Sequence, residues 1–131
     1  MAFLTPMLSK AFTDTGKTIT AANRICAFDS TNGGVKMAAA STALQFAGVS
    51  SAATDINGGA SVDMRGLLQV TAGGTVTKGD WIESDANGKG VTATAPAFTG
   101  ATTKLLIGYA MNTCAAGDLI DVSIHPLLHR P

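Results

Sequence analysis

Hydrophobic and polar residues alternate along much of the chain, as they do in strands that bury one face. The alternation is strict over residues 119–124, where Ile120, Val122 and Ile124 fall on one side. Shorter segments rich in Val, Ile and Thr predict further strands over residues 18–20, 24–28, 35–37, 61–65, 67–70, 75–77, 80–83, 91–93 and 105–110, and another beginning near Leu44. We therefore predict an all-β fold.

Glycine-rich turns separate these segments. The chain contains 15 glycines, many of them gathered at residues 32–34, 57–59, 73–74 and 87–90. Three of these four clusters contain Asn-Gly, which supplies the positive φ angles that tight hairpin turns require. Many short strands joined by glycine-rich hairpins favour a small barrel or a sandwich.

The two halves of the chain contain similar segments. Residues 18–20, 24–25 and 48–49 align with residues 75–77, 81–82 and 108–109. One β unit used twice predicts halves at 15–70 and 71–125, packed about a pseudo-twofold axis around a single core. The alternative is chance similarity among abundant Ala, Gly and Thr residues, because the offset between the halves varies along the chain.

Apolar residues also gather at both ends of the chain, where disorder is common. We predict an N-terminal arm over residues 1–14, a single β domain over 15–125 and a C-terminal tail over 126–131. Either the ends cover an open end of the barrel, or the arm reaches a neighbouring subunit and can be removed without unfolding the domain. The candidate partner-binding residues in these segments are Phe3, Leu4, Pro6, Met7, Leu8, Phe12, Leu127 and Leu128.

Trp81 and Tyr109 fall within predicted strands, and core packing is the simplest interpretation of both. The alternative is that Trp81, flanked by Asp80 and Glu83, points outward and anchors an interface, because Trp is enriched among residues that dominate binding. Arg24, its proposed counterpart in the first half, would then occupy an equivalent exposed site.

Charge is scarce in this sequence. Hydrophobic residues make up 46% of the chain, charged residues only 14%, and the formal net charge is zero. A monomer of this kind has little electrostatic protection against self-association, so we expect permanent partners. There is no basic run to bind nucleic acid, no apolar run of the roughly 20 residues that span a membrane, and no signal-peptide pattern at the start.

Candidate catalytic and metal-binding groups do not form a recognisable set. The two histidines, His125 and His129, lie beside prolines near the chain end, where we expect mobility. Cys26 and Cys114 are far apart in sequence and match no metal or redox spacing, so we expect free, buried thiols. No nucleophile elbow or phosphate-binding loop occurs. We therefore predict a protein without catalytic activity, bound metal or cofactor.

The order of turns and strands in the second half resembles that of the phage capsid cement, or head decoration, proteins. The resemblance covers residues 73–124 and rests on the segments 74–82, 85–91, 107–110 and 115–122. It implies a non-enzymatic virion protein that is made in the host cytoplasm, binds the major capsid protein on the outer capsid surface and stabilises the shell. It also implies a homo-oligomer, a trimer or a dimer on the lattice. The alternatives are another virion β protein, associated with tail or fibre, and a carbohydrate-binding β module.

Overall fold

The computed structural model describes residues 5–30, 32–39, 45–93 and 104–129. Within these residues the chain forms strands and no helix, which confirms the all-β prediction. The strands are β1 (Thr5–Thr13), β2 (Ile25–Phe28), β3 (Val35–Met37), β4 (Phe46–Ser50), β5 (Gly59–Thr71), β6 (Trp81–Ser84), β7 (Gly90–Thr92), β8 (Lys104–Ala110) and β9 (Leu119–His129).

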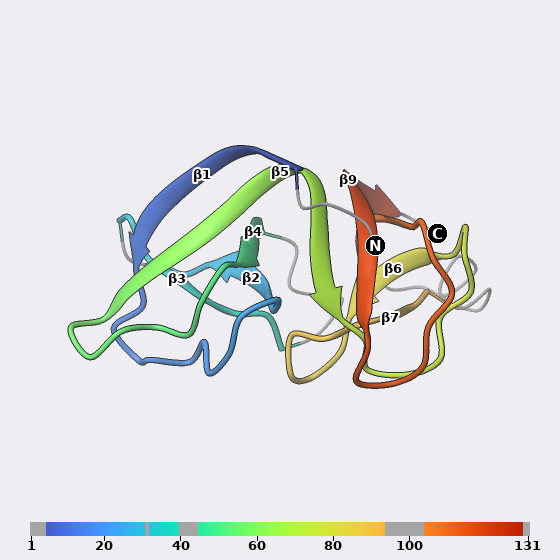
Figure 1. Ribbon diagram of the computed structural model, residues 1–131. Coiled ribbons are helices and arrows are strands. Elements are labelled where there is room, and N and C mark those ends of the chain that lie inside the picture. Colours follow the sequence, from blue (N-terminus) through green and yellow to red (C-terminus); the bar gives the residue numbers. More distant parts are fainter. Residues whose placement is uncertain (1–4, 31, 40–44, 94–103, 130–131) are drawn as a thin grey trace.

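The nine strands belong to one curled sheet with the order β3-β2-β4-β5-β9-β8-β6-β7, and β1 pairs with β5. Strand β5 is the centre of this arrangement. Its first part pairs with β1 and β4, and its last part, from Leu67 to Thr71, pairs with β9. In Figure 1, β5 crosses above the left half of the molecule, bends, and then descends between the two halves.

The strand pairing repeats along the chain. We call β1 to β4 with residues 59–66 of β5 the first unit, and residues 67–71 of β5 with β6 to β9 the second unit. The first unit pairs β1–β5, β5–β4, β4–β2 and β2–β3, and the second pairs β5–β9, β9–β8, β8–β6 and β6–β7 in the same order. Isolated parallel bridges at Thr13–Gly34 and Ala72–Gly90 lie in corresponding regions of the two units, one residue apart in register. The duplication suggested by the sequence is therefore present in the topology.

Registers fix which residues are equivalent. Across the first unit one row of paired residues contains Ser9, Asp63, Val49 and Ile25, and across the second the matching row contains Leu67, Ser123, Tyr109 and Trp81. The counterpart of Trp81 is therefore Ile25, and the predicted match with Arg24 is wrong by one residue. One residue of slip places a side chain on the opposite face of a strand.

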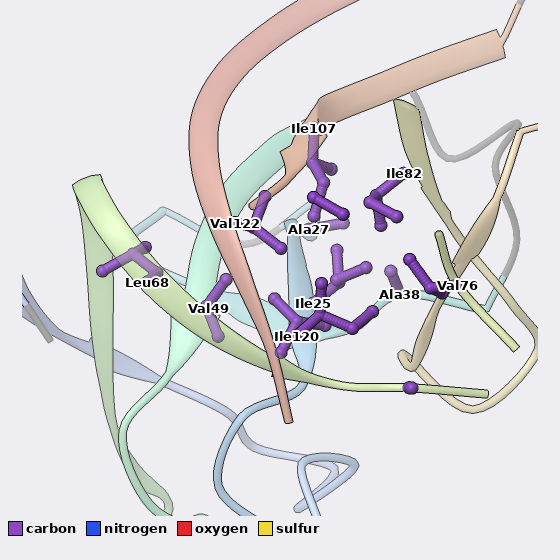
Figure 2. Close-up of a cluster of buried hydrophobic side chains, with 13 residues drawn as sticks. Ile25, Ala27, Ala38, Val49, Leu68, Val76, Ile82, Ile107, Ile120 and Val122 are labelled. Atoms are coloured by element: carbon purple, nitrogen blue, oxygen red, sulfur yellow. The ribbon is translucent and has the colours of Figure 1, made fainter. Parts of the chain in front are cut away.

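The packing between the units runs in one direction. The first unit has its own buried cluster, formed by Ile19, Cys26, Val35, Ala47, Ala60 and Val62. The cluster of the second unit also includes Ile25, Ala27, Ala38 and Val49 from the first unit, and Figure 2 shows Ile25 and Val49 among Leu68, Ile120 and Val122. Among the described residues, the first unit thus caps the interior of the second without a reciprocal contact, and two buried clusters stand in place of the single core expected of a twofold arrangement.

Both chain ends enter the sheet. Residues 5–13, expected as part of an arm, instead form β1, with a register irregularity between Pro6 and Ser9. Strand β9 continues through Pro126, which the sequence analysis placed in a tail. Proline is tolerated in edge strands because its missing N–H has no ladder to join. The predicted strands at 18–20 and 75–77 are absent, although Ile19 and Val76 are buried as apolar residues of loops.

Asp14 follows β1 and lies at the buried centre of a polar network. Its Oδ2 accepts hydrogen bonds from the Thr54 hydroxyl at 2.6 Å and from the Ile19 N–H at 2.9 Å, and its Oδ1 accepts from the Thr18 hydroxyl at 3.2 Å. Burial raises the pKa of this carboxyl, but the hydrogen bonds from Thr54, Ile19 and Thr18 outweigh it, so the pKa lies below its ordinary value. The ionised carboxylate therefore ties the loop after β1 to the start of the loop that precedes β5.

We expect Asp14→Asn to lower the free energy of unfolding at pH 7 by about 1–3 kcal/mol, because the amide leaves buried donors without an acceptor. A carboxyl whose pKa is lowered by folding contributes stability above its unfolded pKa, near 3.8, and loses it as the pH falls through the folded pKa. Urea denaturation at pH 7 and pH 3 should therefore show a smaller difference between the variant and the wild type at pH 3. An equal difference at both pH values would contradict this assignment.

Candidate docking faces

Three rings form a continuous strip on the outer side of the second unit. Trp81 on β6 meets Tyr109 on β8 edge to face, with centroids 5.9 Å apart, and His125 on β9 stacks on Tyr109 at 5.4 Å and an interplanar angle of 5°. Trp81 is half-buried, whereas Tyr109 and His125 are exposed. We call these residues the aromatic face. Rings that already hold one another in place lose little conformational freedom when a partner binds.

This strip revises two sequence predictions. Trp81 is half-buried and contributes to a partly exposed surface instead of the buried core, so it stays a candidate interface anchor. His125 was expected in a mobile tail but lies in β9, because that strand pairs with β8 as far as His129. The sequence places Tyr109 and His125 16 residues apart, and the strip forms because β8 and β9 are neighbours in the sheet.

A second aromatic group lies in the first unit. Phe12 on β1 and Phe28 on β2 meet edge to face with centroids 5.8 Å apart, and the Lys10 ammonium lies 5.5 Å from the Phe12 ring centroid. Phe28 is 37% exposed and Phe12 is half-buried against the cluster of the first unit. We call Lys10, Phe12 and Phe28 the open mouth. Sequence reasoning selected Phe12 but missed Phe28, because it searched for binding residues at the chain ends.

Arg24 does not occupy the exposed site expected of it. The side chain is half-buried, and its Nη1 donates a hydrogen bond of 3.0 Å to the carbonyl oxygen of Asn87. Ile25 N–H donates to the next carbonyl, that of Gly88, at 2.7 Å. Arg24 therefore joins the first unit to a turn of the second.

The other candidate residues lie at the two ends of the sheet. Leu127 on β9 is 48% exposed. Pro6, Met7 and Leu8 lie on β1 and Leu128 lies on β9, and the structure describes the backbone of these four. Phe3 and Leu4 fall outside the described residues. Thr5 pairs with Leu67, which in turn pairs with Ser123, so the start of β1 and the outer end of β9 lie on the same side of the sheet.

An open groove lies where β5 turns away from β9. It is lined by Met64, Arg65, Gly66, Ser123, Ile124, His125 and Pro126. Among these described residues Arg65 and His125 are titratable, and none of the others carries a carboxylate or a thiol.

Reactive groups elsewhere are dispersed. Across the described ranges, no three His, Cys, Asp or Glu side chains are grouped closely enough to hold a metal ion. Cys26 and Cys114 are free thiols, and burial raises the pKa of Cys26 to about 12. Within the same residues, no helix has the length and apolarity needed to cross a membrane.

The described residues define a curled all-β protein that exposes aromatic surfaces. The particular family follows from sequence comparison. The family model of the phage cement proteins matches residues 9–124, so the chain belongs to that family and is a capsid-associated structural component of a phage particle. This agrees with the resemblance noted in residues 73–124.

One solved structure shares the fold over nearly its whole length. The crystal structure of the head fiber gp8.5 N base of bacteriophage phi29 matches with a TM-score of 0.63 and 22% sequence identity, covering 90% of this chain and 93% of that chain. At this identity the likeness establishes the fold. No curated protein has significant sequence similarity to the chain.

Proposed function

We propose that this protein is a cement subunit that attaches to the outer surface of the phage head, contacts the major capsid protein and stabilises the shell without catalysing a reaction. Membership of the phage cement family is the observation that carries this proposal. The low charge of the chain supports it, because 14% charged residues leave much of the surface suited to docking.

The capsid contact is proposed at the side of the sheet where β1 starts and β9 ends. Leu127 is 48% exposed there, and the apolar residues Phe3 and Leu4 precede β1 in the sequence. Exposed apolar side chains gain free energy, at about 25 cal/mol per Å², when a partner covers them. This side lies at one end of β9, and the turn at Leu119 lies at the other end.

Stabilisation follows from linkage and multivalency. A ligand that binds only the assembled shell stabilises it by about 2.7 kcal/mol per site when its concentration is 100 times the dissociation constant. Once one contact of a bridging subunit forms, the remaining contacts become intramolecular, so several modest contacts act as one strong clamp. A rigid sheet suits this task because little ordering is needed on binding.

The test adds purified protein to heads that lack it. We expect the protein to co-sediment with the heads and to raise their melting temperature, and Leu127→Asp to weaken both effects while the variant keeps the wild-type fold. Leu119→Asp is the matched control, because Leu119 is 39% exposed at the opposite end of β9. Binding with no gain in heat resistance would refute the cement role, and equal loss in both variants would refute the proposed contact.

A further inference from the structure

The contact between the two units inside one chain provides a template for a contact between two chains. Ile25 and Val49 lie on the outer side of the first unit, each 2% exposed, because they cover the interior of the second unit. On the receiving side Leu68 and Val70 are fully buried. One outer face of a unit and one interior opening of the next therefore fit together.

In the first unit, the residues at the positions equivalent to Leu68 and Val70 are more exposed. Registers make Lys10 the equivalent of Leu68 and Phe12 the equivalent of Val70, because they pair with Val62 and Ala60 as Leu68 and Val70 pair with Val122 and Ile120. Phe28 ends β2 as Ser84 ends β6. Ser84 is 7% exposed whereas Phe28 is 37% exposed. The open mouth of the first unit is thus equivalent to the opening of the second unit that Ile25 and Val49 fill.

In the second unit, the residues at the positions equivalent to Ile25 and Val49 are more exposed. Trp81 is the equivalent of Ile25, and Tyr109 is the equivalent of Val49. Val49 is 2% exposed, whereas Tyr109 is 37% exposed. Within the part of the chain that the structure describes, the aromatic face therefore repeats the covering face of the first unit but has no unit of its own to cover.

We propose that the aromatic face of one copy docks into the open mouth of a second copy, head to tail, in the way that the first unit docks on the second. The exposed rings suit this contact. Tyr109 and Phe28 are each 37% exposed, and a partner that covers them buries apolar surface.

A head-to-tail contact uses a different surface on each partner. A pair joined in this way still presents one unused aromatic face and one unused open mouth, so copies add until a ring closes or a filament grows. This inference deepens the homo-oligomeric part of the proposed function, but it concerns copies in solution and needs no capsid. A protein that failed this test could still bind heads and raise their melting temperature.

The test is sedimentation velocity over a concentration series with variants in each face. We expect the wild type to form oligomers larger than a dimer, and Tyr109→Glu and Phe28→Glu each to sediment as monomers. An equimolar mixture of the two variants should form a one-to-one dimer and nothing larger, because each supplies the face that the other lacks. Circular dichroism and melting temperature establish that both variants are folded.

Leu119→Glu is the matched control and should assemble like the wild type. Leu119 is 39% exposed, close to the value for Tyr109, and its equivalent in the first unit, Gly59, lies outside the contact between the units. A wild type that is monomeric at every concentration would overturn the proposal. So would assembly that is lost with Tyr109→Glu but kept with Phe28→Glu, because that result indicates a symmetric contact between aromatic faces.

Discussion

Gly108→Ala is expected to lower the free energy of unfolding by about 3 kcal/mol or more, or to prevent folding altogether. Gly108 lies on β8 where the register with β9 shifts, and it pairs with Ile124. A Cβ atom at this position would overlap the backbone oxygen of Ser123, which pairs with Tyr109 and cannot withdraw without breaking the sheet. A clash with backbone is costly because no side-chain rotation relieves it.

Gly48 offers an independent check on the same reasoning. It occupies the equivalent position on β4, where an added Cβ atom would overlap the backbone oxygen of Asp63. Gly48→Ala should therefore destabilise the protein as strongly as Gly108→Ala. Gly74→Ala is the control, since a Cβ atom there meets nothing within 4 Å, and it should change stability by less than about 0.5 kcal/mol. Chemical denaturation followed by Trp81 fluorescence measures all three, and similar values for Gly108→Ala and Gly74→Ala would contradict the account.

Removing residues 1–13 is expected to cost about 5 kcal/mol, an amount comparable to the whole stability of a marginal domain. The deletion takes away β1, which pairs with β5 from Thr5 to Thr13, and exposes the edge of β5. It also removes Phe12, which packs against the buried cluster of the first unit. Asp14 loses the strand that positions it.

A shorter deletion separates this effect from any role of the residues that precede the strand. Removing residues 1–4 leaves β1 intact, so the melting temperature should stay within a few degrees of the wild type. Thermal melts and hydrogen exchange of β5 amides compare the two deletions. If the chain without residues 1–13 melts like the wild type, β1 contributes little to the fold and the arm expected from the sequence is the better description.

The contrast between β1 and β9 explains how far the sequence predicts this fold. Strand β9 was predicted over 119–124 because Ile120 and Val122 are buried by the second unit, and burial selects an apolar residue at every second position. Strand β1 was missed because Lys10 occupies the position equivalent to Leu68. Where the inner side of a strand is not covered by another unit, burial does not select an apolar residue at every second position. Such a strand lacks the alternating pattern that identifies strands in a sequence.

Register was the other limit of the sequence analysis. The alignment of residues 48–49 with 108–109 agrees with the structure, because a glycine is needed wherever a strand approaches a neighbouring backbone closely. The alignment of Arg24 with Trp81 was off by one residue, since no glycine or proline marks the position within β2 and β6. Amino-acid composition does not determine the register of two aligned strands. The pairing of Ile25 with Val49 and of Trp81 with Tyr109 corrects the alignment.

The candidate sites divide in the same way. Trp81 was selected because Trp is enriched among residues that dominate binding, and Phe12 because apolar residues gather near the start of the chain. Phe28 and His125 acquired their importance from neighbours on other strands, Phe12 and Tyr109 respectively, which sequence order does not bring together. Clusters built across a sheet become visible only once the strand order is known.

Cryo-electron microscopy of the phage particle, with this protein labelled, tests the proposed role most directly. The account predicts density for the curled sheet on the outside of the head, touching more than one shell subunit through the side that carries Leu127. Particles in which the label lies on the tail, or in which it contacts no shell subunit, would contradict it.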